Sequence, residues 1–367
     1  MTPFNPSMAV WREPRAERLM ESATTFLTKA ATGSASPLRD GSAESGVGRW
    51  ETIPLPTLSF AEYLRLRQVD IPALPEVRSL RDLFDWGAGE FSKAATVGRP
   101  LTAHFHEYLL RGGFPEPALV DDLIRCQRLL REDIVDKVLK RDMTALYGVR
   151  RVLEVEEIFL YLCYHDGGIL DVPTLSKQLD GINRQSVNNF LDLFEATHLI
   201  YRLRPFGYGK EVLRGRSKVY LADAALPGAV LLLGRRLLEK PDRLGAAVET
   251  AFFKHLHTRY YSESPTFSYW QDKNHRDLEV DLIAQAGDRL VPFEVKYQDA
   301  PCSPKKRKCL RLFLEEKKVA HGYAITQRWE DFGVIEPFSA HKGMEREKLD
   351  AKILSLPAPL ACLWLSE

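Results

Sequence analysis

The sequence predicts a multidomain α/β protein, and three patterns along the chain lead to this fold class. A segment rich in Gly and Ser lies near the N-terminus, amphipathic helices and a basic hairpin occupy the middle, and a hairpin bearing carboxylates lies in the last third. Because a domain takes about 150 residues, the 367 residues allow two or three domains. We place them at residues 1–120, 121–235 and 236–367.

The composition limits the classes of protein to consider. Lys and Arg number 51 and Asp and Glu 50, so the net charge of +1 excludes a uniformly basic nucleic-acid coat protein and an acidic tail. The five Cys form no CxxC pair, which excludes a zinc ribbon and, at this length, a disulfide framework. The hydrophobic fraction of 45% allows a sizeable core, and the scarcity of Cys predicts a protein of the reducing cytoplasm.

No segment predicts export or a membrane partner. The first 20 residues carry five charged side chains and lack the apolar stretch of a signal peptide. The two longest uncharged runs, residues 224–234 and 353–366, are shorter than the roughly 20 residues that span a bilayer. We therefore expect both runs to form buried helix or strand.

The first part of the chain, residues 1–120, shows the weakest pattern. Gly, Ser, Ala and Thr crowd residues 30–48, which predicts either a flexible loop or a strand end followed by a loop that faces a nucleotide. Residues 51–120 predict a mixture of short strands, turns marked by Pro, and helices.

The middle part predicts three helices and a hairpin. Apolar residues at i, i+3, i+4 and i+7 begin at Val155 in the first helix and at Val187 in the third, and Asn183 is a suitable N-cap for the third. Gly167-Gly168 and Gly181 separate the helices, and two strands at residues 199–204 and 218–221 follow. Helix, turn, helix and hairpin is the layout of a winged helix-turn-helix.

Polar and basic side chains on this unit predict contact with DNA. Residues 200–218 hold six Lys or Arg against Glu211 alone, which suits phosphate contacts, and the third helix offers groups that hydrogen-bond to base edges. The alternative is a small helical domain that packs on its neighbours with a solvated polar face. The candidate DNA-binding residues are Arg184, Gln185, Arg202, Arg204, Arg214, Arg216, Lys305 and Lys306, the last two from a basic run further along the chain.

The last part contains a predicted hairpin that gathers carboxylates. Residues 278–284 and 290–297 predict two strands joined by a four-residue loop at 286–289. This register puts Asp281 opposite Glu294 and brings Lys296 to the same face. Carboxylates directly opposite each other repel, so the arrangement calls for a cation, and a hard divalent ion would provide it.

A further carboxylate, Glu249, lies on a helix predicted over residues 244–257, in line with an apolar stripe that includes Phe252 and Phe253. We expect Glu249 to face the sheet; the alternative is a Glu that complements the helix dipole. Glu249, Asp281 and Glu294-Val295-Lys296 together resemble the core of the PD-(D/E)xK nucleases.

That resemblance implies a site for Mg²⁺. Its metal ligands would be Glu249, Asp281 and Glu294, and its catalytic residues Asp281, Glu294 and Lys296. The metal would activate water, and Lys296 would orient that water or stabilise developing negative charge. The same fold also serves as an inert scaffold in some relatives, so both an enzyme and a non-catalytic protein remain open.

The order of segments resembles an AAA-type ATPase family of bacteria and archaea whose C-terminal part is the domain of unknown function 4143. The segments that carry this resemblance are Thr32-Gly33-Ser34-Ala35-Ser36, Gly48-Arg49-Trp50, Leu58-Ser59-Phe60-Ala61-Glu62-Tyr63-Leu64, Gly112-Gly113-Phe114-Pro115-Glu116 and Glu294-Val295-Lys296-Tyr297. The resemblance implies that Thr32 and Ser34 sense a nucleotide and that Arg49 is an arginine finger. Residues 1–120 would then be a truncated remnant of the ATPase domain.

The chain departs from that family in lacking the phosphate-binding loop GxxxxGK[ST]. We therefore expect no ATP hydrolysis by this chain alone, and ATP as a ligand only where another chain supplies the loop. The sequence favours a DNA-binding protein with a Mg²⁺-dependent nuclease site. The alternatives are a non-catalytic remnant that binds nucleic acid or a partner, and an ATP-binding protein completed by a second copy or a partner chain.

Overall fold

The computed structural model describes residues 55–142, 151–179, 182–207, 209, 212, 215–272, 278–300, 307–336 and 350–366. Several residues singled out from the sequence lie outside these ranges. They are the nucleotide-sensing candidates Thr32, Ser34 and Arg49 and the DNA-binding candidates Arg214, Lys305 and Lys306.

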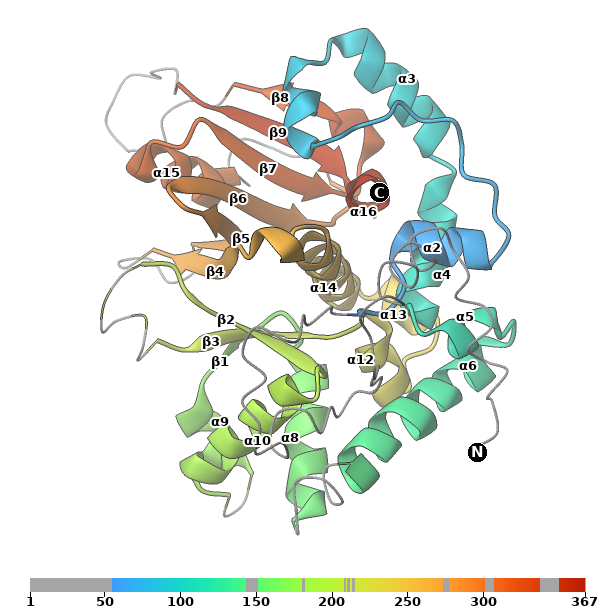
Figure 1. Cartoon of the computed structure of the whole chain (residues 1–367), viewed down its shortest axis with the longest axis vertical. Helices are drawn as coiled ribbons and strands as arrows, with labels where there is room; N and C mark the ends of the chain where they lie inside the picture. Colours follow the sequence, from blue (N-terminus) through green and yellow to red (C-terminus); the bar gives the residue numbers. More distant parts are fainter. Residues whose placement is uncertain are drawn as a thin grey trace, which may run out of the picture. The chain divides into compact units, whose positions relative to one another are not determined.

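A nine-stranded mixed sheet runs through the described part of the chain in the order β1-β3-β2-β4-β5-β6-β7-β9-β8 (Figure 1). Most neighbouring strands are antiparallel, whereas β2 and β4, β6 and β7, and β7 and β9 pair in parallel. The strands are β1 Ile169–Leu170, β2 Ile200–Pro205, β3 Ser217–Leu221, β4 Thr266–Gln271, β5 Glu279–Ala286, β6 Arg289–Lys296, β7 His321–Thr326, β8 Gly333–Ile335 and β9 Lys352–Pro357.

The β5–β6 hairpin has the register that the sequence predicts, although its turn is shorter than expected. The ladder pairs Leu282 with Phe293 and ends at the pair Ala286–Arg289, so its extension places Asp281 opposite Glu294. Only Gly287 and Asp288 form the turn, because each strand runs one residue further at this end. Gly287 has φ 58°, a left-handed conformation that glycine adopts without steric cost.

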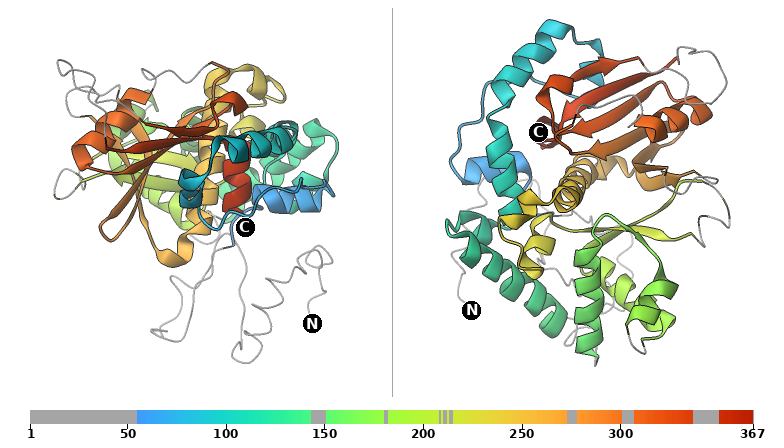
Figure 2. Two further views of the ribbon diagram at one scale, coloured as in Figure 1. Left: turned by 90° about the horizontal axis from the view of Figure 1, so that it is seen from above. Right: turned by 180° about the vertical axis from the view of Figure 1, so that it is seen from behind.

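The helices α8 (Val152–Tyr164), α9 (Val172–Gln178) and α10 (Arg184–Ala196) gather beside the β1–β3–β2 end of the sheet (Figures 1 and 2). Asn183 caps α10 as predicted, because its side-chain oxygen accepts a hydrogen bond of 2.8 Å from the Ser186 N–H. The apolar stripes of α8 and α10 pack together in a core that includes Phe159 and Phe194.

Residues 55–142 form helical segments and, where the structure describes them, no strand, so the short strands expected within residues 51–120 are absent from residues 55–120. A capping box of Ser59 and Glu62 starts the first of these helices. The segments are α2 Phe60–Leu66, η3 Leu80–Asp85, α3 Ala88–Gly98, α4 Leu101–Arg111, α5 Pro115–Leu119, α6 Leu123–Leu129 and the π-helical segment η4 Leu130–Asp142.

Helices cover both faces of the C-terminal half of the sheet. On one face, Phe252 of α14 (Pro241–Arg259) packs with Phe293, and on the other, α15 (Lys308–Lys317) contributes Phe313 to a separate cluster. The side chains along β7 alternate between these two faces of the sheet, because Ile325 belongs to the first cluster and Ala324 to the second. The remaining elements are α12 Ala225–Val230, α13 Arg236–Glu239, η5 Tyr261–Glu263, η7 Trp329–Asp331 and α16 Ala358–Leu365.

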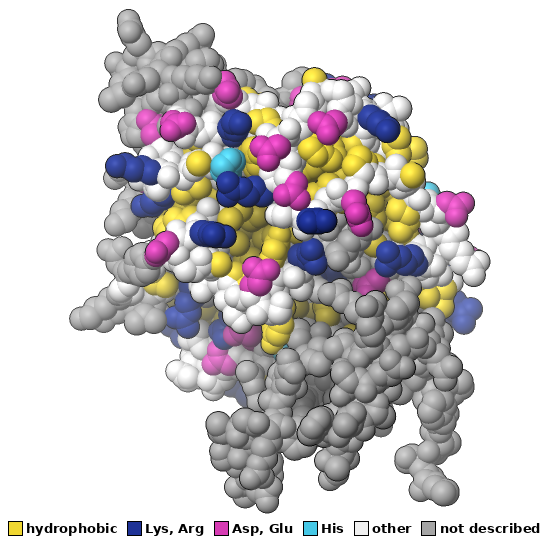
Figure 3. Space-filling view, turned by 45° about the horizontal axis from the view of Figure 1, so that its top comes forward, with side chains coloured by type: hydrophobic (Ala, Val, Ile, Leu, Met, Phe, Trp, Pro, Cys, Tyr) yellow, Lys and Arg dark blue, Asp and Glu magenta, His cyan; other side chains and the backbone are white. Residues whose placement is uncertain are grey.

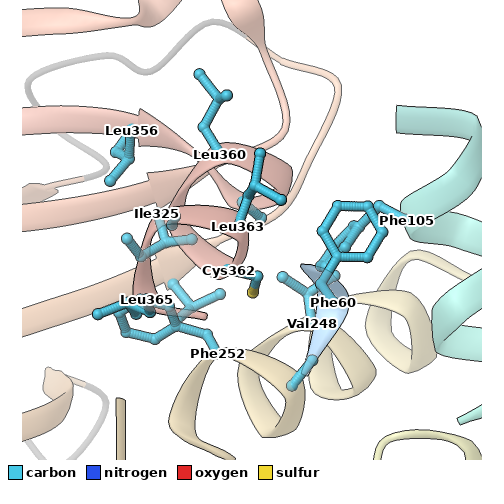
Figure 4. Packing of buried hydrophobic residues seen from close by; sticks show 14 of the residues in the cluster. Phe60, Phe105, Val248, Phe252, Ile325, Leu356, Leu360, Cys362, Leu363 and Leu365 are labelled. Carbon is cyan, nitrogen blue, oxygen red and sulfur yellow. The ribbon is translucent and has the colours of Figure 1, made fainter. Parts of the chain in front are cut away.

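The largest core joins distant parts of the chain. Figure 4 shows Phe60 of α2 and Phe105 of α4 beside Val248 of α14 and Cys362 of α16. The uncharged run 353–366 is therefore buried as β9 and α16, as expected.

No helix in the described ranges has the length and apolar character that crossing a membrane requires.

Candidate functional site

The residues that the sequence predicted as metal ligands and catalytic groups converge at one place. Glu249 from α14, Asp281 from β5, and Glu294 and Lys296 from β6 lie within one network of charged groups. Two further residues join them, Lys218 from β3 and Glu279 from β5. We call the set the carboxylate–lysine site; its members are Lys218, Glu249, Glu279, Asp281, Glu294 and Lys296.

Lys218 of β3 stands at the centre of this site. Its ammonium nitrogen lies 2.7 Å from Glu249 Oε1, 2.6 Å from Glu279 Oε1 and 3.2 Å from Asp281 Oδ1. Its side chain is 2% exposed. Burial lowers the pKa of Lys218, but the surrounding carboxylates outweigh it and hold the pKa well above its ordinary value, so the group is cationic.

Tyr220, two residues along β3, supports the same carboxylate. Its hydroxyl donates a 2.6 Å hydrogen bond to Glu249 Oε1, and its ring stacks on Phe253 of α14 at 4.8 Å between centroids. Burial raises the pKa of Glu249 to about 7, and the nearby charge of Asp281 adds to this effect.

Unlike Glu249, Asp281 is held in its charged form by its surroundings. Its Oδ2 accepts a 2.7 Å hydrogen bond from the backbone N–H of Val295, beyond the last backbone pair of the β5–β6 ladder. Burial raises its pKa, but the two lysine ammonium groups and this N–H outweigh burial, so the pKa of Asp281 lies below its ordinary value. Asp281 is therefore an ionised carboxylate at neutral pH.

Glu294 is completely buried, and its carboxylate has few polar partners. Among the described residues, neither of its carboxylate oxygens has a hydrogen-bond donor that meets the usual geometry, and the ammonium of Lys296 lies 3.4 Å from Oε1. Burial raises the pKa of Glu294 to about 7, against the attraction of Lys296. Lys296 itself is 36% exposed, and the carboxylates around it raise its pKa despite partial burial.

The donor chemistry of the site suits Mg²⁺, because carboxylate oxygens are the ligands this ion prefers. The placement of those oxygens does not suit it, since the oxygens of Glu249 and Asp281 that would face a metal contact Lys218 instead. Within the described ranges no three His, Cys, Asp or Glu side chains are placed to hold a metal ion.

The candidate DNA-binding residues fall into two groups in the described part of the chain. Arg184 and Gln185 are exposed at the start of α10, and Arg204 and Arg216 are exposed at the ends of β2 and β3. Arg202, by contrast, forms ion pairs with Asp192 and Glu195 of α10, which neutralise its charge.

The β2–β3 hairpin belongs to the large sheet. Arg204 and Pro205 of β2 pair with Ser268 and Tyr269 of β4, and the ring of Phe206 packs on Phe313 of α15. Of the six basic residues expected to make phosphate contacts from this hairpin, Lys218 is buried in the carboxylate–lysine site. The hairpin thus has fewer available cations than the sequence suggested.

Lys218, Tyr220 and Glu279 are site residues that the sequence analysis missed. The alternation Lys218-Val219-Tyr220 could have indicated that Lys218 and Tyr220 share one face of a strand. Nothing local in the sequence indicates which carboxylates that face meets, because β3 and β5 are separated by two strands in the sheet.

Comparison with known protein families assigns most of the described chain. Residues 102–237 match the domain of unknown function DUF8612, and residues 244–341 match the domain of unknown function DUF4143. The chain carries a DUF4143 domain. It supplies the four carboxylates and Lys296, whereas Lys218 comes from the segment that matches DUF8612.

A curated relative is an uncharacterized protein from Methanocaldococcus jannaschii. The two are 26% identical over 202 residues, which cover 54% of this chain and 43% of the relative, so the match spans less than half of that protein's length. No solved structure matches the chain. These findings agree with the DUF4143 part of the resemblance, while the nuclease-like core and the ATPase remnant stay predictions.

Proposed function

We propose that this protein binds double-stranded DNA through α10 and does not cleave it unaided. The order α8-β1-α9-α10-β2-β3, in which β1 pairs with β3 and β3 with β2, supports a winged helix-turn-helix in this part of the chain. In such a unit the helix that follows the turn enters the major groove, and here that helix is α10.

The exposed edge of α10 is the observation that carries the proposal. Its apolar side is buried in the local core, and its opposite side presents groups that can hydrogen-bond to base edges or phosphates. These exposed residues are Asn183, Arg184, Gln185, Asn188 and Asn189. On the face shown in Figure 3, by contrast, basic and acidic side chains are interspersed, which gives no block of positive charge there.

The proposed lack of cleavage rests on Lys218. A metal-dependent nuclease needs a cation that polarises a phosphoryl oxygen and acidifies water, and an ammonium group does neither in this way. The ammonium of Lys218 already contacts two of the three predicted metal ligands, Glu249 and Asp281, and it also contacts Glu279.

Fluorescence anisotropy of a labelled duplex across a range of salt concentrations tests the binding. We expect Arg184→Ala to weaken binding and to reduce the slope of log affinity against log salt by about one charge. Arg289→Ala, an exposed arginine at the β5–β6 turn, is the matched control and should leave both unchanged. Equal effects of the two substitutions would show that α10 does not hold the DNA.

A Mg²⁺-dependent nuclease is the second candidate function, and one observation favours it. One site brings together the residues chosen for their resemblance to PD-(D/E)xK nucleases, which are Glu249, Asp281, Glu294 and Lys296.

Incubation of supercoiled plasmid with Mg²⁺ or Mn²⁺ separates the two candidate functions. Nicking that disappears in both Asp281→Asn and Lys296→Ala would establish the nuclease, and intact plasmid would support binding without cleavage.

A further inference from the structure

The buried ammonium of Lys218 has an environment that resembles the coordination shell of a metal ion more than an ordinary ion pair. Three carboxylate oxygens, one from α14 and two from β5, approach it within 3.2 Å. A lysine so completely buried is tolerated only where opposite charges compensate for its lost hydration. Lys218 therefore acts as a fixed cation at the point where the oxygens converge.

The charges of the site would attract a divalent cation if Lys218 were absent. Four carboxylates face two lysines, and Lys218 contacts three of the four while Lys296 lies beside the fourth, Glu294. Both oxygens of Glu294 are buried without a hydrogen bond. With every carboxylate ionised and Lys218 replaced by a neutral residue, the site would carry three negative charges in excess, more than the charge of one divalent ion.

We propose that Lys218 is a resident cation that excludes divalent metals from the carboxylate–lysine site, and that replacing it with a neutral residue turns the site into a divalent-cation site. The ligands of that ion would be the carboxylates of Glu249, Glu279 and Asp281, whose oxygens now face the ammonium. The inference goes beyond the proposed function, since it concerns metal binding in the absence of DNA.

The other buried lysine supplies a matched comparison. Lys254 of α14 is 3% exposed and pairs with Asp223 at 3.1 Å, but its remaining contacts are the neutral oxygens of Thr57 and Leu58. With one carboxylate instead of three, this position lacks the donors of a divalent-ion site. Replacing Lys254 should therefore create no metal site.

The experiment measures Mn²⁺ binding to the full chain by isothermal titration calorimetry, with the free ion followed by its paramagnetic resonance. We expect the wild type to show no saturable Mn²⁺ binding of the kind that Asp281→Asn would abolish. We expect Lys218→Met to bind about one Mn²⁺ per chain, at least about tenfold tighter than the wild type or Lys254→Met. Adding Asp281→Asn to Lys218→Met should abolish this binding.

Two results would overturn the inference. One is a wild-type chain that binds one Mn²⁺ with an affinity lost in Asp281→Asn, because Lys218 would then not exclude metal. The other is a folded Lys218→Met chain that binds none.

If Lys218→Met is unfolded without metal, circular dichroism with and without Mn²⁺ decides the question, with Lys218→Gln as a second variant. Refolding on addition of Mn²⁺ supports the inference, and failure of both variants to fold with Mn²⁺ contradicts it. DNA binding is measured separately by the Arg184→Ala comparison, so the two proposals can fail independently.

Discussion

At the scale of single residues, Glu294 has the least favourable environment in the carboxylate–lysine site. It is fully buried in β6, accepts no hydrogen bond, and has a pKa raised to about 7 from an ordinary value of 4.5. The folded chain therefore holds a proton there at pH values where the unfolded chain has released it. This contribution to stability is complete below pH 4.5 and is lost as the pH rises through 7.

We therefore expect Glu294→Gln to stabilise the protein at high pH. The neutral amide removes the cost of ionising a buried carboxylate, by an amount on the order of 3 kcal/mol at pH 8 that shrinks toward pH 5. Urea denaturation at pH 5 and pH 8 measures the difference. Glu263→Gln, at an exposed glutamate, is the control. A wild-type advantage at pH 8 would show that Glu294 is stabilised as an anion.

The hydroxyl of Tyr220 stabilises the folded protein through its hydrogen bond to Glu249. Tyr220→Phe removes the 2.6 Å hydrogen bond to Glu249 while leaving the ring stacked on Phe253. We expect a loss of about 1–2 kcal/mol in the free energy of unfolding, because the hydrogen bond has a charged acceptor.

The pKa of Glu249 should also rise further above 7, since the hydroxyl that lowers it is gone. Chemical denaturation gives the first quantity, and carboxyl-carbon NMR titration the second. Tyr261→Phe, at an exposed tyrosine, should change neither. An unchanged titration of Glu249 in Tyr220→Phe would contradict the hydrogen bond.

At the scale of elements, the loop after α4 is fixed by a buried ion pair. Asp223 accepts hydrogen bonds from Thr57 Oγ1 at 2.6 Å and from the Gly113 N–H at 3.0 Å, and it pairs with Lys254 of α14. The segment Gly112-Gly113 therefore lies against the backbone of Leu58 with no space for side chains.

Gly113→Ala should be strongly destabilising. A Cβ at this position would lie 2.4 Å from the backbone oxygen of Leu58, which cannot move without breaking its own hydrogen-bond network. We expect a loss of about 2–4 kcal/mol. Gly89→Ala in α3 is the control, because its Cβ would meet no atom within 4 Å, and it should stabilise the helix by about 0.5–1 kcal/mol. Thermal or urea denaturation that ranks the two variants otherwise would contradict this packing.

Local patterns in the sequence predicted individual elements well. The alternation of β5 and β6 gave the pairing of Asp281 with Glu294, because the side-chain period of a strand permits one register that keeps the apolar face buried. The N-cap at Asn183 and the apolar stripe of α10 were also correct, since both depend on residues within one helix.

Contacts between distant segments could not be predicted in the same way. Lys218 had the appearance of one more cation in a basic hairpin, and only the parallel pairing of β2 with β4 joins that hairpin to the rest of the sheet. Residues 51–120 were expected to include strands, but the apolar residues of the described part, residues 55–120, follow helical faces that pack on α14 and α16.

At the scale of the whole molecule, two segments that match different families share one sheet and one core. Residues from both matched ranges, among them Leu203, Tyr220 and Phe252, belong to the largest apolar cluster, and the described residues group as one compact unit. The helices α8 and α10 pack in a separate core that also includes residues of η4, α12, β2 and β3, and these elements connect it to the rest of the molecule.

This arrangement predicts that the two matched segments unfold together. The Trp side chains of the described chain, Trp86, Trp270, Trp329 and Trp364, lie in clusters outside the α8–α10 core, so their fluorescence reports on the DUF4143 domain and its neighbours. Hydrogen exchange of α10 peptides, followed by mass spectrometry across urea concentrations, reports on the other segment. We expect one common midpoint, because α10 shares its core with Val219 and Leu221 of β3, so unfolding of α10 alone would expose the strand that carries Lys218.

Lys218→Met should separate the two transitions. With the central cation gone, the three carboxylates repel one another at the junction, and the α8–α10 segment should open at lower urea concentration than the Trp-containing core. Lys254→Met, which breaks the ion pair inside the larger core, should lower the Trp midpoint instead. If Lys218→Met keeps a single midpoint, the sheet alone couples the two segments and the carboxylate–lysine site makes no energetic contribution to their junction.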